Sequence, residues 1–143
     1  MRVNQISVFL ENKSGRLADV TRTLATHGIN IRALSIADTI DYGLLRLIVN
    51  DPEHATDVLT DAGFTVAKTE VLAIEVPDRP GGLAGIIGVL SAKSLNIEYM
   101  YAFVGRSGDH AIVIFRIEPV DEAIQALREG GARILKGEEL HAL

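Results

Sequence analysis

The chain has 143 residues, of which 48% are hydrophobic and 23% are charged, and its net charge is −5. This composition is typical of a folded globular protein and excludes a long disordered tract. The absence of cysteine excludes disulfides and thiolate metal sites. The basic residues do not gather in one stretch, the N-terminus is polar, and the apolar runs are too short to span a bilayer. We therefore expect a soluble, cytoplasmic protein with neither a nucleic-acid nor a membrane partner.

The first half of the chain predicts strands and helices in a fixed order. Apolar and polar residues alternate at the start, which indicates a strand, and Leu17, Val20 and Leu24 then recur at helical spacing. Gly28 is suited to end that helix in the left-handed conformation. Asp51 and Pro52 are typical of a helix start, as cap and first residue. The predicted elements are a strand at 3–10, a helix at 15–27, a hairpin of 30–38 with 43–50, and a helix at 52–62.

The second half repeats the first. A shift of 66 residues aligns Gly15 with Gly81 and Asn30 with Asn96, and six of the seventeen pairs from 15/81 to 31/97 are identical. A shift of 68 aligns the remainder, with two extra residues in the turn at 105–108, where insertions cost little. Ser94 stands where the first copy has Gly28, and is a poorer helix end. The repeat predicts helices at 81–94 and 119–130 and a hairpin of 96–104 with 110–117.

The order βαββαβ in each copy predicts a fold of the α+β class, with two ferredoxin-like units. We expect domains at 1–68 and 69–143, each an antiparallel sheet of strand order 4-1-3-2 with both helices on one face. Residues 70–75 match the first strand of copy one and also residues 138–143, which predicts a final strand at the C-terminus, with Glu138 and Glu139 at a solvated strand end. No room is left for a flexible linker, so the copies share a continuous strand or exchange their last strands.

The loops that precede the first helix of each copy resemble the ACT domain family. These loops are Asn12-Lys13-Ser14-Gly15-Arg16-Leu17 and Asp78-Arg79-Pro80-Gly81-Gly82-Leu83, and each helix leads to an Asn-Ile strand start. The motif occurs twice in register and the resemblance covers essentially the whole chain. It implies a tandem, free-standing regulatory protein that binds a small molecule, most often an amino acid, and needs no cofactor. Asn12 and Ser14 depart from the Asp and Pro of the fuller loop in copy two.

The resemblance also implies where the ligand binds: between the loop of one unit and the second strand of its neighbour. Carried over, loop 12–17 would face 98–101, and loop 78–83 would face 32–35. The candidate ligand-binding residues are Asn12, Lys13, Ser14, Gly15, Arg16, Leu17, Asn30, Ile31, Asp78, Arg79, Pro80, Gly81, Gly82, Leu83, Asn96, Ile97 and Tyr99. Tyr99 and Tyr101 lie on one face of their strand, where they either contact ligand or cover the helix side of the sheet.

A glycine at a strand-to-helix turn lets backbone N–H groups approach a ligand, and the helix N-terminus favours a carboxylate. Asp78 or the Asn12 amide could then accept from an ammonium group. The alternative is that these two residues only cap their helices and that the glycines only form the turn.

The sequence favours a sensor over an enzyme. The four histidines are isolated, and neither a metal-binding spacing nor a catalytic motif is present. We expect no catalytic and no metal-binding residues. A second hypothesis is a regulatory subunit that docks on a separate metabolic enzyme. The strands at 44–48 and 111–115 are apolar on both faces, which predicts sheet packing between the copies or, in preference, a homodimer.

Overall fold

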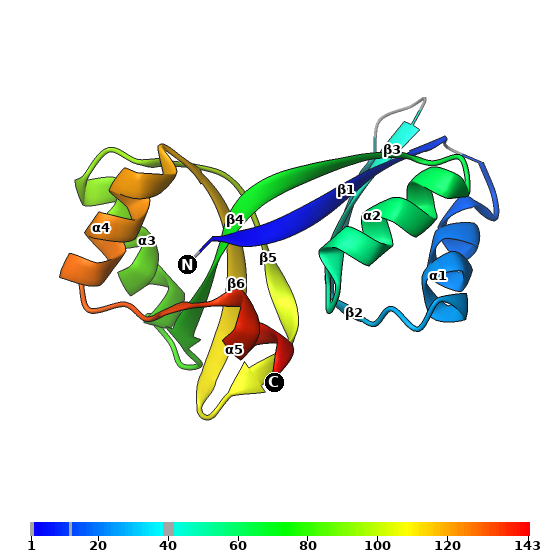
Figure 1. The fold of residues 1–143 in the computed structure, drawn as a ribbon. Coiled ribbons are helices and arrows are strands. Elements are labelled where there is room, and N and C mark those ends of the chain that lie inside the picture. The colour runs from blue at the N-terminus through cyan, green and yellow to red at the C-terminus, as the bar shows by residue number, and fades with distance from the viewer. Residues whose placement is uncertain (1, 12, 39–41) are drawn as a thin grey trace. The chain divides into compact units, whose positions relative to one another are not determined.

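The computed structural model describes residues 2–11, 13–38 and 42–143. The chain forms two compact units. The first unit is Asn4–Thr69, and the second is Glu70–Leu143 together with the N-terminal residues up to Val3. Each unit has its own sheet and its own pair of long helices (Figure 1).

In the first unit two helices cover one face of an antiparallel sheet (Figure 1). Its elements are β1 (Val3–Glu11), α1 (Arg16–Thr26), β2 (Ile31–Asp38), β3 (Tyr42–Val49), α2 (Pro52–Asp61) and the beginning of β4 (Thr65–Pro77). Strand β3 lies between β1 and β2, and β1 also pairs with β4, whose first residues belong to this unit. This is the predicted strand order 4-1-3-2.

Local signals in the sequence set the ends of the two helices. Gly15 has a φ of 91° just before α1, and Gly28 has a φ of 70° just after it, both in the left-handed region that glycine tolerates. Asp51 caps α2, because its Oδ1 accepts a hydrogen bond from the backbone N–H of His54 at 3.2 Å, and Pro52 is the first helical residue. The predicted starts and stops of both helices are confirmed.

The first core lies between the sheet and these helices. Alternate residues of β1 and β3 point toward Val20, Leu24 and Leu59 of the helices, which are all fully buried. The β-strand contribution is Ile6, Val8, Leu10, Leu45, Leu47 and Val49. Burial of apolar side chains at this period of two is what the alternation in the sequence predicts.

The second unit repeats this arrangement, with β4 in the role of its first strand. Its further elements are α3 (Gly82–Ala92), β5 (Asn96–Ser107), β6 (His110–Glu118), α4 (Val120–Glu129), β7 (Ile134–Leu135) and α5 (Gly137–His141). Within the sheet, β6 pairs with β5 and β4, and β4 pairs with β7, so the order is again 4-1-3-2. The core beneath α3 and α4 centres on Phe115, Leu90 and Leu127, which are all fully buried.

The predicted C-terminal strand at 138–143 is wrong. The last strand is the two-residue β7, which pairs with β4 of its own unit at Ala73 and Ile74, and the segment after it is the helix α5. An acidic residue in the first turn explains the helix, because Glu139 accepts a hydrogen bond from the backbone N–H of Lys136 at 3.2 Å. Leu140 then faces inward and is fully buried. Glu138 and Glu139 are therefore helical and do not end a strand.

Strand β4 is continuous over 13 residues. Val66 near its start packs against the first core, whereas Leu72, Ile74 and Val76 belong to the second core. Of the two connections that the sequence left open, the continuous strand is the one present, and β7 is not exchanged.

On the face of the second sheet away from α3 and α4, Ile112 and Ile114 are 1% and 0% exposed.

Candidate functional site

The glycine loop of the second unit leads from β4 into α3 through a tight turn. The backbone N–H of Arg79 donates to the carbonyl of Pro77 at 2.9 Å, and that of Gly82 to the carbonyl of Arg79 at 3.0 Å. Gly81 has a φ of 85°. A Cβ on Gly82 would lie 1.9 Å from the carbonyl oxygen of Pro77, so no larger residue fits this backbone. Both glycines therefore have a structural role in the turn.

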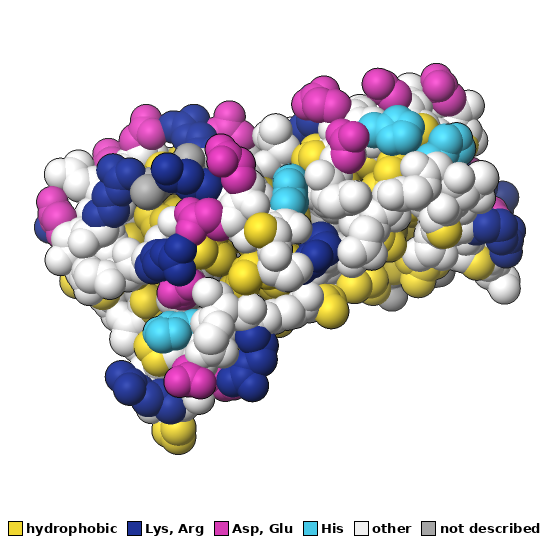
Figure 2. Space-filling model, turned by 60° about the horizontal axis from the view of Figure 1, so that its bottom comes forward, with side chains coloured by type: hydrophobic (Ala, Val, Ile, Leu, Met, Phe, Trp, Pro, Cys, Tyr) yellow, Lys and Arg dark blue, Asp and Glu magenta, His cyan; other side chains and the backbone are white. Residues whose placement is uncertain are grey.

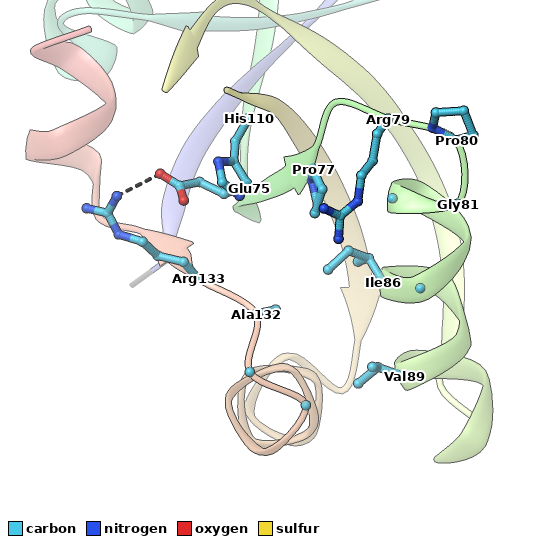
Figure 3. Close-up of a pocket in the computed structure, with 14 residues that line it drawn as sticks. Glu75, Pro77, Arg79, Pro80, Gly81, Ile86, Val89, His110, Ala132 and Arg133 are labelled. Atoms are coloured by element: carbon cyan, nitrogen blue, oxygen red, sulfur yellow. Dashed lines mark hydrogen bonds and ion pairs between the residues drawn. The ribbon is translucent and has the colours of Figure 1, made fainter. Parts of the chain in front are cut away.

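A pocket of about 580 Å³ opens beside this loop (Figure 3). The end of β4 forms one wall with Glu75 and Pro77, and α3 forms the opposite wall with Ile86 and Val89. The segment between α4 and β7 closes the end of the pocket. The remaining lining residues are Arg79, Pro80, Gly81, Gly82, Gly85, His110, Gly130, Gly131, Ala132 and Arg133.

Two charged groups in the pocket lack a full set of partners. The Glu75 side chain is 10% exposed, and its Oε1 accepts hydrogen bonds from Ser107 and Arg133, both at 2.6 Å. Among the described residues, its Oε2 has no donor. Arg79 comes from the loop with its guanidinium directed toward Ile86 (Figure 3), and no ion pair of Arg79 occurs among the described residues.

Arg133 lines the pocket and already pairs with two carboxylates. Its guanidinium pairs with Glu75 and with Glu139 of α5. The backbone N–H of Lys136 and the positive charge of Arg133 hold the pKa of Glu139 below its ordinary value, with the hydrogen bond as the larger cause. Among the described lining residues, Arg79 is therefore the Lys or Arg side chain without a carboxylate partner, and the pocket is also lined by Glu75 with its unpaired Oε2.

Only part of the predicted loop lines the pocket. Arg79, Pro80, Gly81 and Gly82 do so, whereas Asp78 and Leu83 do not. Asp78 is exposed and its Oδ2 accepts from the guanidinium of Arg106 at 2.7 Å. The carboxylate that faces the pocket is Glu75, which the sequence did not single out. Glu75 alternates along β4 with the core residues Ile74 and Val76, so it lies on the other face of the sheet, where a charged residue gives no signal of a site.

The other predicted residues of the second unit lie elsewhere. Asn96 and Ile97 follow the C-terminal end of α3, an 11-residue helix of about 16 Å, so they are far from the loop of their own unit. Tyr99 pairs with Arg116, and Tyr101 with Ile114. Because Phe115, between them on β6, belongs to the helix-side core, both tyrosines lie on the opposite face. The alternative that they cover the helix side of the sheet is wrong. Their rings stack at 6.5 Å.

The loop of the first unit has a different local setting. Asn12 lies outside the described residues. Lys13 and Ser14 are exposed, and Lys13 pairs with Glu11 at 2.8 Å. The Lys13 hydrogen bond, followed by the charges of Lys13 and Arg16, holds the pKa of Glu11 below its ordinary value.

Gly15 forms the same left-handed turn as Gly81, and Leu17 is 40% exposed. The guanidinium of Arg16 lies over the ring of Phe64, 4.8 Å from its centroid. Asn30 is engaged in the fold, since its backbone N–H donates to the Asn50 side chain at 2.9 Å. Ile31 is half-buried and packs against the first core.

The described residues contain no cluster of three or more His, Asp or Glu side chains suited to a metal ion. In the same part of the chain, no helix is long and apolar enough to cross a membrane. On the face in Figure 2, Lys and Arg side chains are scattered among Asp and Glu.

The family model of the ACT domain pair matches residues 1–142. The chain belongs to the ACT domain pair family. Its fold is very similar to that of protein BT0572 from Bacteroides thetaiotaomicron, with 43% sequence identity, a TM-score of 0.93, and coverage of 100% of this chain and 98% of that one.

Two further structures share the fold of this ACT domain pair. The regulatory subunit of aspartate kinase from Thermus thermophilus is 18% identical, with a TM-score of 0.62 and coverage of 89% and 91% of the two chains. The same subunit from Thermus flavus is 17% identical, with a TM-score of 0.59 and coverage of 90% and 92%. No curated protein matches the chain.

Proposed function

We propose that this ACT domain pair is a regulatory protein that binds a free amino acid in the pocket beside the Arg79–Gly82 loop. The observation that carries the proposal is a pair of opposite charges that line that pocket without a partner among the described residues: Arg79, which is exposed, and the Oε2 atom of Glu75. Amino-acid sensing is typical of the family, and the loop is the one that the family resemblance singles out.

A zwitterion fits these charges in one orientation. Its carboxylate lies at the Arg79 guanidinium, near the positive end of α3, and its ammonium donates to Glu75. The half-buried His110 ring lies on the strand side of the pocket near Glu75 (Figure 3). A volume of about 580 Å³ leaves room for the rest of the ligand.

The walls favour an aliphatic side chain. Between the two charged ends the lining is apolar, with Pro77, Ile86, Val89 and Ala132. Because Arg133 already pairs with two carboxylates, a second ligand carboxylate would find no unpaired cation among the described lining residues. We expect valine, leucine and isoleucine to bind more tightly than aspartate or glutamate.

Calorimetric titration of the protein with each of the twenty amino acids tests the proposal. Replacement of Arg79 by Gln should weaken binding by about 1.5–3 kcal/mol, the range for a hydrogen bond to a charged group, which is roughly 10- to 100-fold. Arg106→Gln is the matched control, because Arg106 is an exposed arginine nearby that is not in the pocket lining. The proposal fails if no amino acid binds the wild type at millimolar concentration.

The ammonium position has two candidates. The family resemblance points to Asp78 and to the second strand of a neighbouring unit, whereas the pocket points to Glu75. Glu75→Gln and Asp78→Ala separate them, since only the residue that receives the ammonium should lose affinity when changed. Thermal midpoints should be measured alongside, because Glu75 also anchors Ser107 and Arg133.

A second candidate function is control of a separate enzyme in trans. Apolar side chains are exposed on the second strands: Leu34 and Ile36 on β2 and Met100 and Val104 on β5, between 37% and 64% exposed. Such residues favour a protein partner or a second copy of this chain. Affinity capture from a lysate with and without the bound amino acid, followed by identification of a metabolic enzyme whose capture depends on that ligand, would support this function. Capture of nothing in either condition would count against it.

A further inference from the structure

The pocket of the second unit has a counterpart in the first unit. Applying the 66- and 68-residue shifts of the repeat, the lining residues Glu75, Pro77, Gly82, Gly131, Ala132 and Arg133 correspond to Phe9, Glu11, Arg16, Gly63, Phe64 and Thr65. These same six residues, with Leu10, line a hollow of about 210 Å³ in the first unit. The two places are therefore equivalent in the fold but differ in size, 580 against 210 Å³.

Two side chains account for the difference. Arg16 stands where the second unit has Gly82, and Phe64 stands where it has Ala132. Phe64 is 7% exposed and belongs to the first core, and the Arg16 guanidinium stacks on its ring at 4.8 Å. The Nε atom of Arg16 is buried without a hydrogen-bond partner, and its Nη1 lies 3.7 Å from the Asp19 carboxylate, so the contact with the Phe64 ring and a long ion pair hold this side chain in the hollow.

The backbone around Phe64 and Ala132 is the same in the two units. Gly63 and Gly131 have φ values of 92° and 80°, and the next residue in each unit donates its N–H to a leucine of the preceding helix, at 3.0 Å for Phe64 and 2.9 Å for Ala132. The second unit therefore has the backbone that holds a phenylalanine in the first.

We infer that the chain has one open ligand pocket of this kind, in the second unit, and that in the first unit Arg16 and Phe64 fill the equivalent pocket from within. The identity of the ligand rests on the proposed function, whereas the filling of the first pocket does not. The two copies are thus divided between a binding unit and a unit whose own side chains reduce the equivalent space from about 580 to about 210 Å³.

The stoichiometry of binding tests the open pocket. With L-leucine, L-isoleucine and L-valine as probes, the wild type should bind one molecule per chain at this kind of site. Ala132→Phe should weaken the affinity for the amino acid at least 10-fold. The thermal midpoint should stay the same or rise, because the new ring would take the place that Phe64 has in the first unit. Ala92→Phe places the same ring on an exposed position of α3 outside the pocket and should bind normally.

A second arm tests the closed pocket without any amino acid. Arg16→Ala should lower the thermal midpoint, and millimolar ethylguanidinium should restore part of the loss by entering the space over Phe64. The control is Arg22→Ala, at an arginine of the same helix whose side chain is 73% exposed. Ethylguanidinium should not raise the thermal midpoint of this variant.

The outcomes separate the two claims. Failure of every amino acid to bind the wild type removes the proposed function, and the ethylguanidinium arm still decides whether Arg16 fills a pocket. Two equal amino-acid sites per chain, or normal binding to Ala132→Phe, overturn the inference while amino-acid binding stands. Equal responses of Arg16→Ala and Arg22→Ala to ethylguanidinium also overturn it.

Discussion

Gly81 and Gly82 are adjacent, but each is a glycine for its own reason. Gly81 needs the left-handed backbone at φ 85°, whereas Gly82 needs the absence of a Cβ beside the Pro77 carbonyl. In the first unit Arg16 takes the place of Gly82, and Glu11 that of Pro77. The sequence predicts a glycine turn at both loops, but the reason for the second glycine lies in a contact across the turn.

Replacing Gly82 with Ala should destabilise the protein by about 1–3 kcal/mol, the usual cost of forcing extra volume into a packed site. Gly88→Ala is the matched control in the same helix, because nothing lies within 4 Å of its would-be Cβ. That change should stabilise by about 0.5–1 kcal/mol through helix propensity. Chemical denaturation measures both, and effects of equal sign would contradict the assignment.

The candidate site could be predicted from the sequence only in part. The loop was found because it is a local motif that occurs twice. Glu75 was not found, because its partners Ser107 and Arg133 are 32 and 58 residues away in the chain. Likewise, the filling of one pocket by Arg16 and Phe64 depends on a contact between residues 48 positions apart, and no local sequence pattern predicts such a contact.

At the scale of the elements, the two repeats differ at the ends of equivalent helices. Gly28 follows α1 with a φ of 70°, and Ser94 follows α3 with a φ of 57°; it is the one non-glycine with positive φ among the described residues. Ser94, which the sequence indicated as the poorer helix end, thus has the same left-handed backbone conformation as Gly28. The fold keeps the left-handed turn and places an unfavourable residue in it.

Ser94→Gly should therefore stabilise the second unit by about 0.5–1 kcal/mol, the relief of left-handed strain less the greater freedom of glycine in the unfolded chain. Ser91→Gly, within α3, should instead destabilise by a similar amount. Thermal unfolding of both variants checks the signs, and a loss of stability in Ser94→Gly would refute the argument.

The helix α5 should respond to pH through Glu139. Because the folded pKa of Glu139 is lowered, its ionised form stabilises the fold above the unfolded pKa of about 4.5, and this stabilisation is lost as pH falls through the folded pKa. Glu139→Gln should therefore lower the thermal midpoint at pH 7, and the difference from the wild type should shrink as pH falls below about 4.5. A difference that stays the same down to the acid unfolding of the protein would contradict the role given to its charge.

Helix α5 also marks the limit of the element prediction. Periodicity and helix caps located the four long helices and the hairpins to within a few residues. The C-terminal segment was misread because its resemblance to residues 70–75 rests on a short apolar pattern, which does not distinguish strand from helix. The decisive interactions of Glu139 are a hydrogen bond from the backbone N–H of the cap residue Lys136 and an ion pair with the side chain of Arg133.

At the scale of the whole molecule, the N-terminal residues belong to the second unit. Val3 is 4% exposed, and Arg2 pairs with Glu70 at 2.7 Å and with Asp121. Val3→Ala should cost about 1.6 kcal/mol, at about 0.8 kcal/mol for each of two buried carbons. Hydrogen exchange should accelerate in residues 70–77. Val104→Ala, 64% exposed, is the control and should change nothing; acceleration confined to the first unit would contradict the prediction.

Assembly is the remaining prediction at this scale. We expect a homodimer in solution, with the exposed Leu34 and Ile36 among the residues it buries. Sedimentation velocity at micromolar concentration should give a dimer for the wild type and a shift toward monomer for Ile36→Lys. A wild-type monomer under these conditions would contradict it, as would a dimer unaffected by the charge.

The placement of Val3 in the second unit has a consequence for folding. Val3 precedes the whole first unit in the sequence, yet it belongs to a unit whose other residues, Glu70–Leu143, all follow the first unit. Contacts between segments so distant in sequence form slowly, so we expect the burial of Val3 to be a late step in folding. Both ends of the described chain belong to the unit that holds the open pocket, and Glu139 near the C-terminal end pairs with Arg133 of its lining, so an affinity tag at either end should be removed before binding assays.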